Sequence, residues 1–425
     1  MIGTDLYVEQ IEKDAVRFTD ESHLKPLIQT ASSAKYVLLG EASHGTSEFY
    51  TVRSVITKQL IEKHGFSFIA VEGDWPSCYE VNRYVKGNAP EYKNATEALQ
   101  AFNRWPSWMW ANEEIVELID WLYTYNQKQT TEHKKVGFYG IDVYSLWESM
   151  EAIIQYLEKI QSPDVEKAKQ AFACFEPFHR KAEMYGVSAA LYGENCMEEV
   201  VALLQTIQQN KHAYNSDPEA SLNMQINALV TANAEAYYHA MVTHDDKSWN
   251  IRDRHMVEAL DFIGHYYGAE AKGIVWEHNT HIGDARATDM ARQGLENVGQ
   301  LTREKYGQEY IYSIGFGTHH GTVIAARSWG NPLEKMIVPK AKRGSWEDAL
   351  HQAGAFNKYI MFTEENREVF QRTIGHRAIG VVYHPEMEHL GNYVPSRLSD
   401  RYDAFIHIEE TNALSPLSVQ ELTVT

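Results

Sequence analysis

The sequence predicts an α/β fold, in which a central, mostly parallel sheet is flanked by helices and interrupted by a helical insertion. In the first 145 residues, short apolar runs alternate with segments of helical period, which is typical of repeated βαβ units. The strand pattern disappears between about residues 146 and 268 and then returns. We therefore expect an N-terminal part of the α/β core at 1–145, a helical insertion at 146–268 and a C-terminal part of the core at 269–425.

The elements of the N-terminal part follow from short β-type runs and helical spacing. The expected strands cover residues 36–40, 66–71 and 136–139. The apolar residues expected to line helices between them recur at positions three and four apart: Phe49, Val52, Ile56 and Leu60, then Ile115, Leu118, Ile119 and Leu122. A Trp-rich stretch at residues 104–110 is expected to be a loop, whose aromatic side chains either plug the core or line an apolar pocket.

The insertion shows only helical periodicity, for example at Leu146, Met150, Ile153 and Leu157. Further strands are expected at residues 273–276, 310–315, 336–338 and 378–383, and a last apolar run at 404–408 is expected to be an edge strand. These strands complete the sheet that the N-terminal part begins.

Composition limits the classes of partner. The 425 residues include 39 Lys and Arg against 58 Asp and Glu, which gives a formal net charge of −19. This charge disfavours nucleic acid or an anionic membrane as a partner, because phosphate binding needs a basic surface. No run approaches the ~18–20 apolar residues of a membrane span, and the N-terminus lacks the apolar region of a signal peptide. We expect a cytoplasmic protein, and the sequence does not indicate its oligomeric state.

The three cysteines are Cys78, Cys174 and Cys196. Their odd number and wide spacing favour reduced thiols over a disulfide scaffold. None belongs to a CxxC pair, so a zinc site built from thiolates is not expected.

Polar residues gather at the ends of the expected strands. In open α/β sheets ligands bind at the carboxyl ends of the strands, so these residues are expected around one crevice. They are Glu41 and His44 after the first strand, Glu72 and Asp74 after the second, Asp142 after the third, His278 and His281 after the fourth, and His319 and His320 after the fifth.

Two arginine positions leave alternatives open. Arg53 falls on the apolar stripe of its helix, where a guanidinium needs a partner. It either forms a structural ion pair with Glu41 or Glu72 or binds a substrate oxygen. Arg252 and Asp253 enter a helix that continues through Leu260, and they are either substrate-binding residues or surface charges.

The sequence has no G-x-S-x-G nucleophile elbow, no phosphate-binding P-loop and no H-E-x-x-H zinc helix. Several motifs occur in order from about residue 34 to the end of the chain: LGEASHG at 39–45 with Glu48 and Arg53, EGD at 72–74, NIRDR at 250–254, WEHNTHIGD at 276–284, and GVVYHPE at 380–386 with RYDA at 401–404. Together these motifs resemble those of the erythromycin esterase family.

The resemblance implies hydrolysis of a carboxylic ester or macrolide lactone by activated water, as in family members that confer antibiotic resistance. It assigns the general base to His44 and matches Glu41, Arg53, His278 and His281 to the family's other active-site positions. It also implies a helical subdomain over a large cleft. We expect Glu72, Asp74, Arg252, Asp253 and His319 to bind the substrate.

Elementary chemistry supports these roles. An imidazole with a pKa of ~6.5 accepts a proton from water near neutral pH, and a carboxylate beside it stabilises the imidazolium. Arg53, His278 or His281 could donate to the oxyanion of ester attack. The spacing of His278 and His281 would also suit a divalent metal. We expect a site without metal or other cofactor, with a divalent metal as the alternative.

Three functions remain in competition. The first is a macrolide-esterase-like hydrolase acting on a small-molecule ester or lactone. The second is an enzyme acting on acylated sugars, because some relatives carry a succinoglycan (exopolysaccharide) biosynthesis label. The third is a metal- or haem-binding module that uses the histidine-rich crevice. A fold alone does not choose among them.

Overall fold

The computed structural model describes residues 5–419 except 179, 181, 193–194, 215–218 and 244. Its strands are β1 Val16–Arg17, β2 Tyr36–Leu39, β3 Phe68–Asp74, β4 Gly137–Asp142, β5 Gly273–Trp276, β6 Ile311–Ala326, β7 Leu333–Val338, β8 Lys358–Met361, β9 Ile374–Arg377, β10 Tyr393–Ser396 and β11 Ala404–Thr411.

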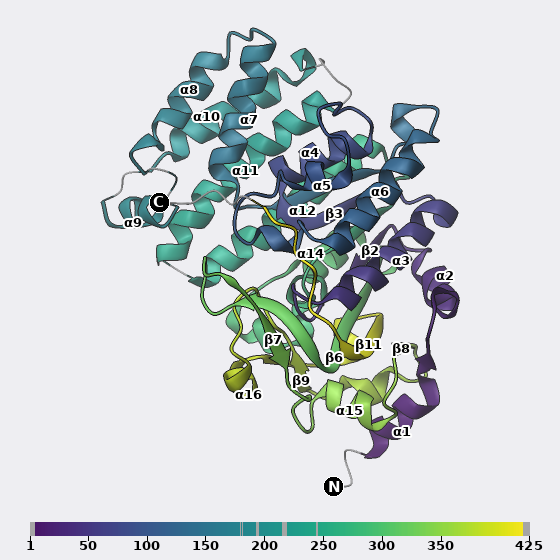
Figure 1. The fold of residues 1–425 in the computed structure, drawn as a ribbon. Helices are drawn as coiled ribbons and strands as arrows, with labels where there is room; N and C mark the ends of the chain where they lie inside the picture. Colours follow the sequence, from purple (N-terminus) through teal and green to yellow (C-terminus); the bar gives the residue numbers. More distant parts are fainter. Residues whose placement is uncertain are drawn as a thin grey trace.

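The α-helices surround a nine-stranded sheet (Figure 1). They are α1 Asp5–Asp14, α2 Lys25–Ala31, α3 Ser47–His64, α4 Trp75–Val85, α5 Ala95–Leu99, α6 Glu113–Gln127, α7 Leu146–Lys159, α8 Val165–Ala173, α9 Ala182–Tyr192, α10 Met197–Gln209, α11 Ala220–Thr243, α12 Asp245–Tyr267, α13 Asn279–Ile282, α14 Val298–Tyr306, α15 Trp346–Gln352, α16 Glu388–Gly391 and α17 Leu398–Arg401.

The main sheet is mostly parallel, as the sequence predicts. Its order is β1-β8-β11-β6-β2-β5-β3-β4, and β7 pairs with the extended end of β6. The strands from β11 to β4 in this order run parallel to their neighbours, whereas β1, β8 and β7 are antiparallel additions. The α/β fold class is therefore confirmed.

The central strands are buried on both faces, which explains why they read as continuous apolar runs. In β2, Val37 and Leu39 belong to one hydrophobic cluster, whereas Tyr36 and Leu38 belong to the cluster on the opposite face. Alternate side chains of a strand point to opposite faces, so the two clusters are the two layers of core on either side of the sheet.

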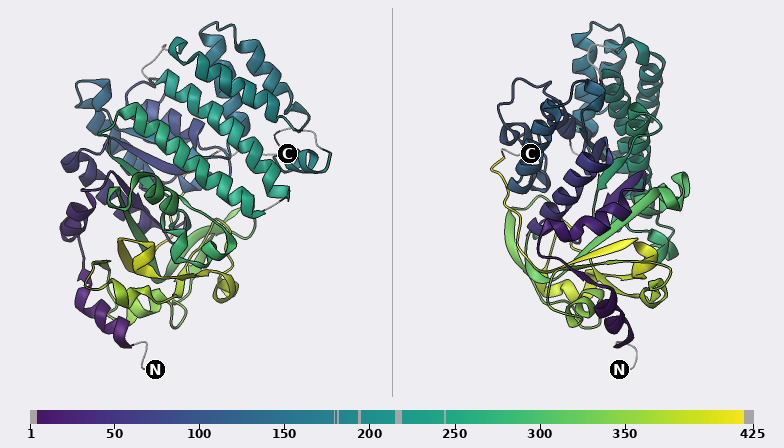
Figure 2. Two further views of the ribbon diagram at one scale, coloured as in Figure 1. Left: turned by 180° about the vertical axis from the view of Figure 1, so that it is seen from behind. Right: turned by 90° about the vertical axis from the view of Figure 1, so that its right-hand side faces the viewer.

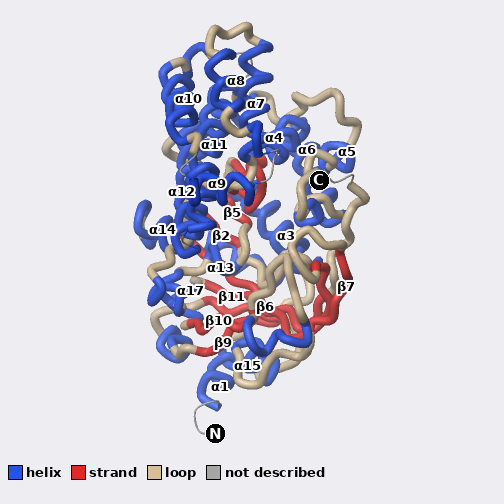
Figure 3. Tube along the Cα trace, turned by 90° about the vertical axis from the view of Figure 1, so that its left-hand side faces the viewer, coloured by secondary structure: helices blue, strands red, loops and turns tan. Residues whose placement is uncertain are grey.

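In the described part of the chain between β4 and β5, the α-helices are α7 to α12. The helices α7 to α10 and part of α11 share a core of their own that includes Met150, Ile153 and Leu203. The helix α12 packs instead on one face of the sheet. Figures 2 and 3 show most of these helices at the end of the molecule opposite the N-terminus, with the strands below them. Helices therefore occur where the sequence predicts them, and the domain boundaries at 146 and 268 stay a prediction.

Two predicted strands need correction. Residues 378–383 form no strand: β9 ends at Arg377, and the following segment makes only isolated bridges at Ile379 and Val382. The run at 404–408 lies inside the sheet rather than at its edge, because the short strands β8 and β1 extend the sheet beyond β11. The four-residue run of β8 was too short to be recognised from its pattern.

The expectation of three reduced thiols is wrong for two of them. Cys174 and Cys196 form a disulfide, whereas Cys78 is free and buried. Cys174 follows α8 and Cys196 precedes α10, and the helical hairpin through α9 brings these two ends together. The sequence separation of two cysteines does not indicate whether the fold brings them together. Among the described residues, the helices are all too short or too polar to cross a membrane.

Candidate active site

The predicted strand ends meet at one edge of the sheet. Leu39 of β2 is level with Trp276 of β5, which is level with Val71 of β3, and Asp74 pairs with Asp142 of β4. The loops that follow these residues therefore carry their polar side chains into a common region.

His44, Glu41 and Arg53 form a buried chain of polar contacts. Nδ1 of His44 lies 2.9 Å from Oε1 of Glu41, and Arg53 donates to the other oxygen of that carboxylate. Arg53 is fully buried, and its guanidinium carbon lies 4.5 Å from the ring centre of Tyr50 and 4.4 Å from that of Trp276. Of the two readings of Arg53, the structure shows the ion pair with Glu41.

This chain orients the imidazole of His44. With Nδ1 held by Glu41, Nε2 points toward Glu72, whose Oε1 lies 4.0 Å away. Burial alone would lower the pKa of His44, but the negative charges of Glu72 and Glu41 outweigh burial and raise this pKa above its ordinary value. The imidazole is therefore a stronger base than a free histidine.

Glu72 is the centre of a second group of contacts. Its Oε1 accepts from Arg252 at 2.8 Å, and its Oε2 accepts from the backbone N–H of His278 at 2.8 Å. Burial alone would raise the pKa of Glu72, but the positive charges of His281, His44 and Arg252 outweigh it and hold the pKa well below its usual value. Glu72 is thus a permanent negative charge between the histidines.

Arg252 connects three strand ends. Besides Glu72, it donates to Oδ1 and Oδ2 of Asp142 at 2.9 and 2.7 Å, and its guanidinium lies 4.8 Å from the ring centre of Tyr144. It comes from α12, so the helical segment supplies the main cation of the site. Of the two readings of Arg252, a surface charge is excluded.

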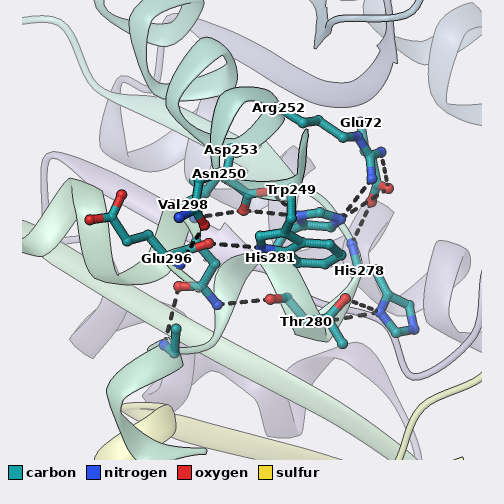
Figure 4. Close-up of polar contacts among 12 residues, drawn as sticks. Glu72, Trp249, Asn250, Arg252, Asp253, His278, Thr280, His281, Glu296 and Val298 are labelled. Atoms are coloured by element: carbon teal, nitrogen blue, oxygen red, sulfur yellow. Dashed lines mark hydrogen bonds and ion pairs between the residues drawn. The ribbon is translucent and has the colours of Figure 1, made fainter. Parts of the chain in front are cut away.

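His281 is held on both sides of its ring (Figure 4). Nδ1 lies 2.9 Å from each carboxylate oxygen of Asp253, and Nε2 lies 3.1 Å from Arg252. Trp249 stacks on the ring with centres 4.6 Å apart. Both ring nitrogens of His281 are therefore engaged by other side chains. Asp253 is fully buried behind His281 and positions it.

His278 is held as a neutral imidazole. Burial and the neighbouring positive charge of His44 lower the pKa of His278 well below its ordinary value. Its Nδ1 lies 2.8 Å from the hydroxyl oxygen of Thr280 and 3.3 Å from the backbone nitrogen of the same residue. Nε2 has no hydrogen-bond partner among the described residues. The ring centres of His278 and His44 are 4.9 Å apart, so His278 lies beside the proposed base.

A cavity of about 130 Å³ adjoins His44, Glu72 and Arg252. Its wall includes Asp74, which makes a bidentate ion pair with Arg104, and the aromatic residues of the Trp-rich stretch. That stretch is a loop with one short 3₁₀ turn, Ser107–Met109, as expected. Its aromatic residues both pack in the core and line the cavity.

The structure does not bring His319 into this group. The strand β6 does not end near Gly315 but continues to Ala326, which carries His319 to the helix α15. Its ring stacks on that of His351 with centres 3.7 Å apart. The rule that polar residues follow the strand end fails here because the strand is long.

Sequence reasoning also missed Glu277 and Arg104. Glu277 is fully buried, with no partner for either oxygen among the described residues. Burial raises the pKa of Glu277 well above its ordinary value, and the charges of Glu72 and Asp253 add to this effect. Glu277 directly follows the apolar end of β5 and precedes His278, and this position could have indicated a buried carboxyl group near the site. Arg104 lies in a loop without periodicity, so no pattern indicates it.

The comparison with protein families agrees with this geometry. The family model for erythromycin esterase matches residues 61–411. The chain belongs to the erythromycin esterase family. Among curated relatives, a putative hydrolase of Bacillus subtilis (strain 168), YbfO, is 22% identical over 409 residues, covering 91% of this chain and 86% of that protein. Erythromycin esterase type II of Escherichia coli is 20% identical over 376 residues, covering 80% and 83%.

Two solved structures share the fold of this erythromycin esterase family member. A crystal structure of a succinoglycan biosynthesis protein has a TM-score of 0.80 at 18% identity and covers 98% of this chain and 99% of that one. A mutant erythromycin esterase in its open conformation has a TM-score of 0.67 at 14% identity and covers 96% and 99%. At these identities the similarity extends to the fold alone. Family membership supports a hydrolase activity.

Proposed function

We propose that the protein hydrolyses a carboxylic ester with a water molecule that His44 activates. The observation that carries this proposal is the buried chain from Arg53 through Glu41 to His44, which fixes the imidazole at Nδ1 and turns Nε2 toward the cavity side. General bases are held in this way by a carboxylate in many hydrolases, and the arrangement stabilises the imidazolium that forms.

In the proposed reaction, Nε2 of His44 removes a proton from water while the water oxygen attacks the ester carbonyl carbon. The carbonyl carbon becomes tetrahedral, and the carbonyl oxygen becomes an oxyanion. When the oxyanion collapses, the bond to the alkoxy oxygen breaks, and the alkoxide takes the proton from His44. The products are one carboxylic acid and one alcohol, and the enzyme returns to its initial state.

The oxyanion needs donors that are in place before the reaction. Arg252 lines the cavity beside His44, and Nε2 of His278, which would carry a hydrogen in this role, has no partner among the described residues. Both suit this role because a fixed donor in a site with little water stabilises developing charge without reorganisation. Loss of one such donor lowers turnover by ~10²–10³. Glu72 would hold the Arg252 and His278 donors in position.

The size of the cavity favours a small acyl group or a sugar over a macrolide. Pockets for drug-sized ligands have volumes of ~300–1,000 Å³, whereas the cavity beside His44 measures about 130 Å³. One solved structure that shares this fold is named a succinoglycan biosynthesis protein. An acylated sugar is therefore our second candidate substrate beside a macrolide lactone, which would require the site to open. We propose that the reaction needs no metal ion. We also propose that the protein is cytoplasmic.

The test is hydrolysis of an aryl acetate, a peracetylated monosaccharide and a 14-membered macrolide, followed by mass spectrometry of the acid and alcohol products. We expect wild type to cleave the aryl ester and to retain this activity after treatment with chelator. Cleavage of only one of the other two substrates identifies the substrate class. If wild type cleaves none of the three, the proposal is wrong.

A further inference from the structure

Four histidines and one glutamate gather outside the cleft, where α15 crosses the sheet. None of them belongs to the proposed ester site. They come from three elements: His319 and His320 from β6, His407 and Glu409 from β11, and His351 from α15.

The register of two parallel strands explains the grouping. Ile408 of β11 is level with Thr318 of β6, and Glu410 is level with His320. Glu409 and His319 therefore occupy equivalent positions on neighbouring strands, and their side chains share a face of the sheet. On this face, α15 lays the ring of His351 flat on that of His319, with 7° between the ring planes.

Three side chains bring donor atoms to one point. One ring nitrogen each of His319 and His320 and a carboxylate oxygen of Glu409 all lie within 4.8 Å of one another. His319 is only 3% exposed, yet neither of its ring nitrogens has a hydrogen-bond partner among the described residues, and Nδ1 of His320 has none either. Buried polar atoms are rarely left in this state unless they bind something.

Glu409 is fixed in place. Nδ1 of His351 lies 2.6 Å from Oε1 of Glu409, and Nε2 of His407 lies 3.2 Å from Oε2. The two histidines therefore hold the carboxylate of Glu409 from both sides.

We propose that His319, His320 and Glu409 bind one divalent transition-metal ion of the zinc class. Two imidazole nitrogens with one carboxylate suit Zn²⁺, Co²⁺ or Ni²⁺ rather than Mg²⁺ or Ca²⁺, which prefer oxygen ligands. Ligand atoms around a tetrahedral zinc are ~3.4 Å apart, which follows from bonds of ~2.1 Å. The donor atoms, which lie within 4.8 Å of one another, would have to approach by about 1 Å to hold the ion.

The remaining histidines support the ion indirectly. His351 and His407 hold the carboxylate of Glu409, which is the role that outer partners have around bound metals. The side chains of His351 and Glu409 are 36% and 14% exposed, so the ion can enter from solvent. The ion would fasten β11 and α15 to β6, independently of the proposed ester reaction.

The test uses the full-length protein, freed of metal by chelator and dialysed against Zn²⁺ or Co²⁺. We expect one equivalent of bound ion per chain and cobalt absorption bands typical of nitrogen and oxygen ligands. His319→Gln and Glu409→Gln should weaken binding more than 100-fold, and His351→Ala by ~10–100-fold. The matched control is His265→Ala, whose side chain is 79% exposed on α12 and which should bind as wild type does.

Two results would overturn the proposal. One is the absence of a stoichiometric ion in wild type. The other is binding that persists in His319→Gln and Glu409→Gln but disappears in His281→Gln, which would place the ion in the cleft. If His319→Gln does not fold, as judged by circular dichroism, His320→Asn takes its place at a more exposed ligand and should lose the same cobalt bands.

Discussion

Glu41→Gln tests the link between the base and its buried support. The change removes the negative charge that Nδ1 of His44 and the guanidinium of Arg53 share. Arg53 is then buried without a counter-charge, and His44 loses one of the two carboxylates that raise its pKa. One substitution therefore has consequences for stability, for rate and for pH dependence.

The magnitudes follow from burial. Breaking a buried ion pair by removing one partner costs ~3–5 kcal/mol of folding free energy. The catalytic loss should be ~10²–10⁴ in kcat, since the carboxylate sets the tautomer of the base and stabilises its imidazolium. The pH at which kcat/KM falls on the acid side should move downward, because the pKa of His44 falls when Glu41 is neutral.

The assay is kcat/KM for an aryl acetate against pH, together with urea unfolding of the same preparations. Glu62→Gln is the control, since it makes the same chemical change at an exposed position of α3, the helix that carries Arg53. It should alter neither measurement. The reasoning is refuted if Glu41→Gln keeps kcat within about threefold of wild type and its acid limb does not move.

Three further predictions concern parts of the chain beyond this contact. Reduction of the Cys174–Cys196 disulfide, which closes a loop of 22 residues, should lower the free energy of unfolding by about 3 kcal/mol, and a transition unchanged by reductant would contradict this. Burial lowers the pKa of His255 to about 4, so the stability that the neutral imidazole contributes is present above pH ~6.5 and is lost as the pH falls to about 4. In His255→Gln, the free energy of unfolding should therefore depend less on pH in this range, by on the order of 3 kcal/mol in total. Glu277→Gln should change the free energy of unfolding by less than about 1 kcal/mol, because the buried carboxyl is already neutral; a loss of several kcal/mol in urea unfolding would show that it is ionised.

The parts of the site that the sequence predicts are local. Glu41 and His44 lie three residues apart in one loop, and Arg53 is set by the period of the next helix. The relative positions of residues within a short segment depend mainly on local backbone conformation. Loop position and helical spacing were therefore sufficient to predict these three residues. The same reasoning placed the ends of β2, β3, β4 and β5 at one edge of the sheet.

The rest depends on how distant segments meet. Asp253 binds His281 across 28 residues, and Arg104 binds Asp74 across 30, and no spacing rule gives such pairs. His319 was assigned to the cleft because the length of β6 is not visible in its pattern. The disulfide was missed because a helical hairpin, rather than sequence separation, brings the two cysteines together.

The central claim is that His44 removes a proton from the attacking water. Its most direct test is the pH profile of kcat/KM for an aryl ester with wild type and His44→Ala, each checked for folding. The account predicts that wild-type activity falls below a pKa that is above ~6.5, and that His44→Ala loses ~10²–10⁴ of the rate together with this acid limb, while KM stays close to that of wild type. A folded His44→Ala enzyme that keeps both the rate and the acid limb would contradict the account.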